Sequence, residues 1–255
     1  MGILQDRVIA VTGGAGGIAR GIAEAILEQG GRVGLMDLDR AKVEAAAKGL
    51  NAGDRVVGLV SDVTDPDSTG AALAELKNRM GRLDGLVNNA GIVRLGPATE
   101  TTAAGLDLEL AVNVKGVFLA SQAAAKLFTN GGSIVNVASN AGKVGYRNMA
   151  GYNASKAAVI NLTRSLALEW AEKGINVNAV CPGGVATDML KSVADFLAPR
   201  LAQDKEALLG TMHPAQLGRH VQPIEVGRVV AFLLSDAAVI IRGQSINIDG
   251  GDTPY

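Results

Sequence analysis

Short apolar runs alternate along the chain with longer segments in which apolar residues recur every three or four positions. Buried strands alternating with amphipathic helices are typical of a parallel sheet covered on both faces. The predicted strands are Arg7–Thr12, Arg32–Asp37, Val56–Val60, Leu83–Asn88, Ser133–Ser139, Asn176–Cys181 and Gln244–Ile248. The predicted helices are Gly17–Gln29, Arg40–Lys48, Pro66–Met80, Thr102–Phe128, Gly151–Lys173 and Pro223–Leu234. Right-handed crossovers then predict the α/β class: a doubly wound Rossmann fold with a seven-stranded parallel sheet in the order 3-2-1-4-5-6-7.

One segment, residues 187–221, interrupts this alternation between the sixth strand and the helix at Pro223. It is mixed in polarity and holds both histidines, His213 and His220. Loops at the carboxyl ends of strands carry ligands in doubly wound sheets, so a long insertion there indicates a substrate lid. The alternative is a helical hairpin that only packs against a neighbouring subunit. We therefore expect one domain over residues 1–255, with a lid at 187–221 inside it.

Charge and composition exclude several classes of protein. The 24 Lys and Arg residues balance 25 Asp and Glu residues without a basic stripe, and aromatics are only 3% of the chain, which argues against nucleic-acid binding. A single cysteine, Cys181, excludes an internal disulfide, and with two histidines it argues against a zinc site, so no metal is expected. Without a signal peptide or an apolar run of about 18 residues, a cytoplasmic protein is expected.

Glycine is the one residue type in clear excess, at 33 of 255 residues. Several glycines cluster in Thr12–Ala19, directly after an apolar run and before a helical pattern. Such a loop lets the backbone approach a pyrophosphate, which the N–H groups and dipole of the helix N-terminus then bind. No Gly-Lys-Ser/Thr follows, so a Walker phosphate loop is excluded.

Asp37 ends the second predicted strand, 20 residues after Gly17. An acid at this place accepts hydrogen bonds from the adenosine ribose hydroxyls. It would repel a 2′-phosphate by roughly 4 kcal/mol per unit charge at contact, for an effective dielectric of ~20. The next residue is Leu38 rather than an arginine, and the glycine loop carries no cation. The sequence therefore predicts NAD rather than NADP, although a solvated aspartate at a strand end is the alternative.

Tyr152 and Lys156 lie four residues apart in a strongly helical segment, so they share one face. An ammonium near a phenol favours the phenolate and is expected to lower the pKa of Tyr152 from ~10 toward neutrality. Such a tyrosine exchanges protons with an alcohol or carbonyl oxygen. Ser139 ends the fifth predicted strand, where its hydroxyl would hold the same oxygen. By spacing alone, chance packing of a tyrosine and a lysine remains the alternative. Cys181, with no histidine nearby in sequence, is expected to be an inert packed thiol.

These ordered motifs resemble the classical short-chain dehydrogenase/reductase family over essentially the whole chain. The resemblance implies that Tyr152 is the general acid/base, Lys156 lowers its pKa and binds the nicotinamide ribose, and Ser139 orients the substrate oxygen. Asn113 would hold a water that connects Lys156 to solvent. The family's loop usually ends in a further glycine, and Ala19 stands here. The implied catalytic residues are Asn113, Ser139, Tyr152 and Lys156. The implied cofactor residues are Gly13, Gly16, Gly17, Ile18, Asp37, Leu38, Asp62, Val63, Asn89, Ala90, Gly91, Tyr152, Lys156, Pro182, Gly183, Val185 and Thr187.

The expected activity is that of an NAD-dependent oxidoreductase which interconverts a secondary alcohol and its ketone. Most residues expected around the substrate are apolar, which favours a cyclic or hydrophobic alcohol, whereas Arg94 or Arg147 would suit a hydroxy acid or a sugar-derived substrate. A non-catalytic NAD-binding regulator is a further alternative. The resemblance implies a homotetramer, or a homodimer, built on the long helices around Thr102–Phe128 and Gly151–Lys173, with a second interface at residues 245–255. The substrate candidates are Arg94, Ser139, Asn140, Tyr146, Gly184 and Met189.

Overall fold

A computed structural model describes residues 2–253. Its seven strands form one parallel sheet in the order β3-β2-β1-β4-β5-β6-β7, which confirms the predicted fold class and strand order. The central strands are buried along their whole length because helices cover both faces. The strands are β1 (Val8–Thr12), β2 (Arg32–Asp37), β3 (Val56–Val60), β4 (Gly85–Asn88), β5 (Gly132–Val137), β6 (Ile175–Pro182) and β7 (Ser245–Ile248).

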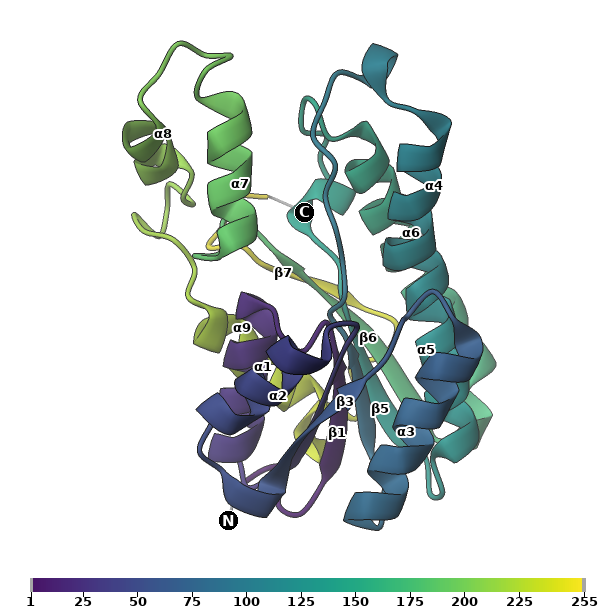
Figure 1. The fold of residues 1–255 in the computed structure, drawn as a ribbon. Coiled ribbons are helices and arrows are strands. Elements are labelled where there is room, and N and C mark those ends of the chain that lie inside the picture. The colour runs from purple at the N-terminus through teal and green to yellow at the C-terminus, as the bar shows by residue number, and fades with distance from the viewer. Residues whose placement is uncertain (1, 254–255) are drawn as a thin grey trace.

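The helices divide between the two faces of the sheet (Figure 1). On one face lie α1 (Gly17–Glu28), α2 (Arg40–Gly49) and α9 (Pro223–Leu233). The other face is covered by α3 (Pro66–Met80), α5 (Gly116–Leu127) and α6 (Ala150–Glu169), with α4 (Ala103–Leu110) beyond α5. Each face has its own buried aliphatic cluster, and the sheet between them holds the carboxyl ends of the strands at one edge.

Two glycines let α1 and α9 touch backbone to backbone. A Cβ on Gly21 of α1 would overlap the carbonyl group of Pro223, and a Cβ on Gly227 of α9 would overlap the carbonyl oxygen of Gly21. The two helices therefore cross at the closest distance that main chains allow. Part of the glycine excess is thus explained by packing and not by ligand binding.

The predicted helix Thr102–Phe128 is wrong as one uniform helix. The structure divides it into α4, a π-helical turn at Ala111–Lys115, and α5. The π-turn contains Asn113, the first residue of the implied catalytic set. A π-turn widens the backbone locally and is frequent at functional sites, because it changes where one side chain points.

The insertion at 187–221 folds into two helices, α7 (Asp188–Leu197) and α8 (Lys205–Thr211). Both lie past the carboxyl-terminal edge of the sheet, opposite the upper part of α4 and α6 (Figure 1). The segment is pinned to the rest of the fold by a parallel bridge between Val185 and Val221. Within residues 2–253, no helix combines the length and the apolar character that crossing a membrane requires.

Candidate active site

The glycine-rich loop after β1 is braced by the loop after β4. Thr12 Oγ1 accepts hydrogen bonds from the backbone N–H groups of Asn89 (3.0 Å) and Ala90 (3.1 Å). The Asn89 side-chain amide donates in return to the carbonyl oxygens of Thr12 and Gly13, each at 3.1 Å. Gly13 has a φ of 63°, and a Cβ there would lie only 2.7 Å from Ala90 Cα. Two segments predicted to bind the cofactor are therefore in contact, and the crossing needs glycine.

The end of this loop has the geometry of an anion site. Helix α1 begins at Gly17 after the N-cap Gly16, and no side chain caps its first N–H groups. Those N–H groups and the helix dipole suit a pyrophosphate. Asp37 Oδ2 accepts a hydrogen bond from Ala15 N at 3.0 Å, so the acid at the end of β2 lies against the same loop. Cradle and acid together fit a dinucleotide, with its pyrophosphate at α1 and its adenosine ribose beside Asp37.

The residues implied at the adenine lie on the neighbouring strand ends. Asp62 Oδ1 accepts hydrogen bonds from the N–H (2.8 Å) and the hydroxyl (2.7 Å) of Thr64, which fixes the turn after β3. Val63 packs against Gly116, the first residue of α5. Leu38, which follows β2, is 68% exposed. Beside this fixed turn, the exposed Leu38 side chain offers an apolar surface to an adenine ring.

Ser139, Tyr152 and Lys156 meet at the carboxyl end of β5. Ser139 follows this strand, and the tyrosine and lysine come from one face of α6. Lys156 is 4% exposed, and its Nζ donates to the carbonyl oxygen of Val137 at 2.8 Å. The same Nζ lies 5.6 Å from the centre of the Tyr152 ring, and Tyr152 hydrogen-bonds with Ser139. The helical spacing and the strand end thus bring together the three residues singled out in the sequence.

The expected direction of the Tyr152 pKa is wrong in this structure. Burial raises the pKa of the phenol above its usual value, the hydrogen bond with Ser139 opposes this, and the charge of Glu109 adds to it. Burial also lowers the pKa of Lys156 to about 8. The ammonium is hydrogen-bonded to a main-chain carbonyl, so desolvation outweighs its attraction for a phenolate. A positive charge brought beside the phenol by an oxidised nicotinamide would act in the opposite direction.

Asn113 is tied to the segment that follows β4. Its Nδ2 donates to the carbonyl oxygen of Ile92 (2.9 Å) and to Ser155 Oγ (3.0 Å), and its Oδ1 accepts from Ile92 N (2.9 Å). Both amide hydrogens are therefore used within the protein. A Cβ on Gly91 would lie 3.4 Å from both Asn113 Oδ1 and Lys156 Nζ, so the asparagine lies close to the lysine.

Glu109 is a buried acid that the sequence did not point to. It lies one helical turn before Asn113, is 1% exposed, and accepts a hydrogen bond from Arg94 N at 2.9 Å. Its carboxylate contacts Gly151, the residue before Tyr152, where any Cβ would collide with it. Burial raises the pKa of this carboxyl group, and the hydrogen bond from Arg94 opposes the shift. Glu109 and Asn113 therefore hold the chain at two places after β4, with a cavity-lining residue, Val93, between them.

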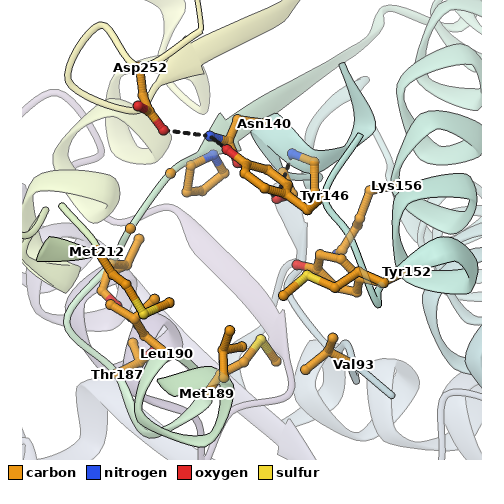
Figure 2. Close-up of a pocket in the computed structure, with 18 of the residues that line it drawn as sticks. Val93, Asn140, Tyr146, Tyr152, Lys156, Thr187, Met189, Leu190, Met212 and Asp252 are labelled. Carbon is orange, nitrogen blue, oxygen red and sulfur yellow. Dashed lines mark hydrogen bonds between the residues drawn. The ribbon is translucent and has the colours of Figure 1, made fainter. Parts of the chain in front are cut away.

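A cavity of about 740 Å³ opens at the carboxyl edge of the sheet, with Tyr152 in its wall (Figure 2). It joins the nicotinamide end of the implied cofactor site to the implied substrate site. The predicted site residues that line it are Ile18, Asn89, Gly91, Ser139, Asn140, Tyr146, Tyr152, Lys156, Pro182, Gly183, Gly184, Val185, Thr187 and Met189. Gly13, Gly16, Gly17, Asp37, Leu38, Asp62, Val63, Ala90 and Asn113 do not line it.

Arg94 does not line the cavity, in contrast to its prediction as a substrate residue. Its side chain lies against α4, where a Cβ added to Gly105 would be 3.2 Å from Arg94 Nε. The sequence also missed part of the wall. The apolar spacing of α7 could have revealed some of these residues, but nothing local pointed to Asp252, which lies 112 positions from its partner Asn140. The residues missed are Val137, Ala138, Asn148, Met149, Leu190, Val193, Arg200, Leu201, Thr211, His213 and Asp252.

Two other predictions concern groups that take no part in the site's chemistry. Cys181 is buried in β6, and burial raises the pKa of its thiol, which agrees with an inert packed side chain. Among the described residues, no three His, Cys, Asp or Glu side chains come together as a metal site would require.

Comparison with known proteins identifies the family. The family model described as enoyl-(acyl carrier protein) reductase matches residues 13–253. The chain is 41% identical to 2-(S)-hydroxypropyl-CoM dehydrogenase 3 of Xanthobacter autotrophicus, over 98% of each chain. It is 39% identical to D-threitol dehydrogenase of Mycolicibacterium smegmatis, over 98% of this chain and 94% of that one. The crystal structure of levodione reductase superimposes with a TM-score of 0.91 at 33% identity, covering 99% of this chain and 100% of that one.

A parallel sheet with a dinucleotide cradle beside a cluster of Ser, Tyr and Lys defines an oxidoreductase of the Rossmann type. The chain belongs to the short-chain dehydrogenase/reductase family.

Proposed function

We propose that the protein is an NAD-dependent oxidoreductase that interconverts a secondary alcohol and its ketone, with Tyr152 as general acid/base. The observation that carries the proposal is the cluster of buried Ser139, buried Lys156 and half-buried Tyr152 in the wall of a cavity of about 740 Å³. Ile18, at the start of α1, lines the same cavity. A bound nicotinamide would supply hydride transfer, and the protein would supply position and proton transfer.

Each residue of the cluster has a separate task. Tyr152 as the phenolate accepts the proton from the alcohol during oxidation, and the resulting phenol returns it to the carbonyl oxygen during reduction. Ser139 Oγ hydrogen-bonds the substrate oxygen and aligns it with the phenol. Lys156 would bind the nicotinamide ribose. In the structure its ammonium donates to the carbonyl oxygen of Val137, and an ammonium that also interacts with Tyr152 favours the phenolate. Asn113 holds a water that connects the lysine to solvent.

Substitution of the tyrosine tests the chemistry. Tyr152→Phe removes the proton donor but keeps the ring, so we expect kcat to fall by about 10²–10⁴-fold. NADH affinity, measured by fluorescence titration, should stay near the wild-type value, because the cradle at α1 is untouched. Wild-type-like kcat in this variant would refute the assignment. A wild-type protein that binds NADH but oxidises none of a panel of secondary alcohols, diols and hydroxy acids would instead support a non-catalytic regulator.

NAD is proposed over NADP because the Asp37 carboxylate lies at the glycine loop without a cation beside it. A 2′-phosphate placed there would meet a negative charge at contact distance. Measuring KM for both cofactors tests this proposal. We expect the lower KM with NAD, and a preference for NADP would contradict it.

The insertion at 187–221 is proposed as the substrate lid. Support comes from α7 and the segment after α8, which face Tyr152 across the cavity with apolar side chains such as Met189, Leu190 and Met212 (Figure 2). This wall favours a cyclic or otherwise hydrophobic alcohol. A hydroxy acid is the second candidate, since Arg147 and Arg200 also line the cavity. The relatives act, by their names, on substrates as different as threitol and levodione, so the names do not choose between the two.

A further inference from the structure

The cavity has one polar corner, made by residues that come from distant parts of the chain. Asn140 Nδ2 donates one hydrogen to Tyr146 Oη at 2.9 Å and the other to Asp252 Oδ2 at 3.3 Å. Figure 2 shows the three side chains grouped together, with Tyr152 and Val93 on another side and Met189, Leu190 and Met212 opposite. We call Asn140, Tyr146 and Asp252 the polar corner.

The polar corner is held in place by the turn that carries Asp252. Asp249 accepts hydrogen bonds from Gly251 N (3.1 Å) and from Thr253 N (2.9 Å). Gln216, in the segment after α8, donates to the carbonyl oxygen of Gly251 at 2.9 Å. The backbone of the turn is therefore fixed from both sides. Asp252 is exposed, and its side chain lines the cavity, where the hydrogen bond from Asn140 orients it.

The corner also connects to the reacting centre. Asn140 is the neighbour of Ser139 in the chain, is 5% exposed, and accepts a hydrogen bond from Ser139 Oγ at 3.5 Å. A ligand oxygen at Ser139 and Tyr152 would therefore have its adjacent carbons close to the corner. A second hydroxyl group on a neighbouring carbon atom, or one carbon further along, is the ligand group that would reach the corner.

The chemistry of the corner selects a neutral hydroxyl group. A carboxylate can accept about four hydrogen bonds, and among the described residues Asp252 receives them from Asn140 and Tyr146. Acceptor capacity thus remains for a ligand O–H. Burial raises the pKa of Tyr146, and the charge of Asp252 adds to this, so its phenol stays protonated. A ligand carboxylate at the same place would meet the negative charge of Asp252.

We propose that Asn140, Tyr146 and Asp252 form a subsite for a second hydroxyl group, and that the substrate is a neutral diol or polyol oxidised at its neighbouring secondary alcohol. This inference rests on the proposed function. The apolar wall of α7 then contacts the carbon chain on the other side of the ligand.

Three probe alcohols of similar size test the proposal. The probes are 2-butanol, 2,3-butanediol as each stereoisomer, and 3-hydroxybutyrate, with kcat/KM measured by NADH formation. A charge-assisted hydrogen bond in a cavity makes the best diol isomer about 10-fold or more better than 2-butanol. Asp252→Ala and Tyr146→Phe each reduce this diol-to-butanol ratio several-fold, while the control Met189→Leu on the opposite wall preserves it.

The contrary outcomes are distinct. The subsite is refuted if 2-butanol and the diols lose activity in the same proportion in both variants, because the corner would then only support the fold. It is equally refuted if wild-type protein shows no preference for a diol, or prefers 3-hydroxybutyrate, in which case the arginines select the substrate. If NADH forms with none of these probes but does form with other secondary alcohols of the wider panel, the subsite is refuted and the proposed function stands. If no alcohol of the panel yields NADH, the proposed function fails and the subsite fails with it. Tyr146→Phe keeps the ring and leaves the Asp249 turn intact, so a folding defect in Asp252→Ala does not obscure the result.

Discussion

The buried positive charge of Lys156 lowers the free energy of unfolding of the protein. Burial lowers its pKa to about 8 from the ordinary 10.5, so the folded protein binds this proton more weakly than the unfolded chain does. Below pH 8 the buried ammonium destabilises the fold, and between pH 8 and 10.5 stability rises, because the folded state gives up the proton first. We expect Lys156→Met to raise the free energy of unfolding of the cofactor-free protein by about 2 kcal/mol at pH 7.

The gap should narrow from pH 8 upward and close above pH 10.5, where Lys156 loses its proton in the unfolded state as well as in the folded one. Urea unfolding at pH 7, 8.5 and 10 measures it, and activity should be lost at every pH. A methionine variant less stable than wild type at pH 7 would mean that the hydrogen bond to Val137 outweighs the desolvation of the ammonium.

Glu109 is expected to influence the reaction without touching the substrate. Its charge raises the pKa of Tyr152, and its Oε1 accepts from Arg94 N. Glu109→Gln keeps an acceptor for Arg94 but removes the charge, so the pKa of Tyr152 falls. The acid limb of the pH profile for alcohol oxidation should then move to lower pH by up to about one unit, equivalent to about 1.4 kcal/mol.

Asp107→Asn, on the exposed side of the same helix, is the matched control and should leave the profile in place. A profile for Glu109→Gln that coincides with wild type while KM rises would reduce Glu109 to a purely structural support for the segment after β4.

The sequence identified site residues whose meaning is local. Tyr152 and Lys156 stand at helical spacing, and Ser139 stands at a strand end, so periodicity is enough to group them. Glu109 and Asp252 gain their roles from tertiary contacts with segments far along the chain. The prediction that the pKa of Tyr152 is lowered was wrong for a related reason. The pKa depends on how far the phenol is removed from water, which residue spacing does not show.

At the scale of elements, the sequence pattern located strands better than irregular helices. The bounds of β2, β3 and α3 coincide with the prediction, because turn residues and Pro66 mark them. The π-turn around Asn113 was missed because its residues suit an ordinary helix equally well. A π-turn differs from an α-helix in the register of its backbone hydrogen bonds, which residue type does not specify here. The hydrogen bonds between Asn113 and Ile92 are tertiary contacts and are equally absent from the local pattern.

The crossing of α1 and α9 gives a prediction about stability. Gly227→Ala places a methyl group against the carbonyl group of Gly21 and should destabilise the protein by about 1–3 kcal/mol or more. Gly70 is also inside a helix, but a Cβ there meets nothing within 4 Å. Gly70→Ala should therefore stabilise the protein by about 0.5–1 kcal/mol. Chemical unfolding of the two variants measures both, and equal changes in stability would contradict the close crossing.

At the scale of the whole molecule, two exposed apolar patches support the proposed homotetramer. The first lies on α4, α5 and α6, with Leu108 45%, Phe118 40% and Leu168 81% exposed. The second lies after α9, with Val239 53% and Ile240 89% exposed, near the predicted interface at 245–255, of which residues 254–255 lie outside the described part. Large apolar side chains exposed on neighbouring elements are candidates for interaction surfaces.

Light scattering after size exclusion tests this assembly. We expect the mass of four chains for wild type and of two for Ile240→Glu, because a charge at one patch leaves the other interface intact. Ile3→Glu, on an exposed apolar residue outside both patches, is the control and should remain tetrameric. A wild-type monomer would contradict the proposal.

The turn that carries Asp252 has a consequence for the way the molecule is made. The glycine loop and β1 to β5 leave the ribosome first, followed by the helix that holds Tyr152 and Lys156. The lid segment and Asp252 emerge last. The lid forms the wall opposite the tyrosine, and Asp252 completes the polar corner. The growing chain therefore acquires the glycine loop and the Ser139, Tyr152 and Lys156 cluster before the lid and Asp252, which we propose to choose the substrate. Changes near the far end can alter that choice while the portion that emerges first stays the same.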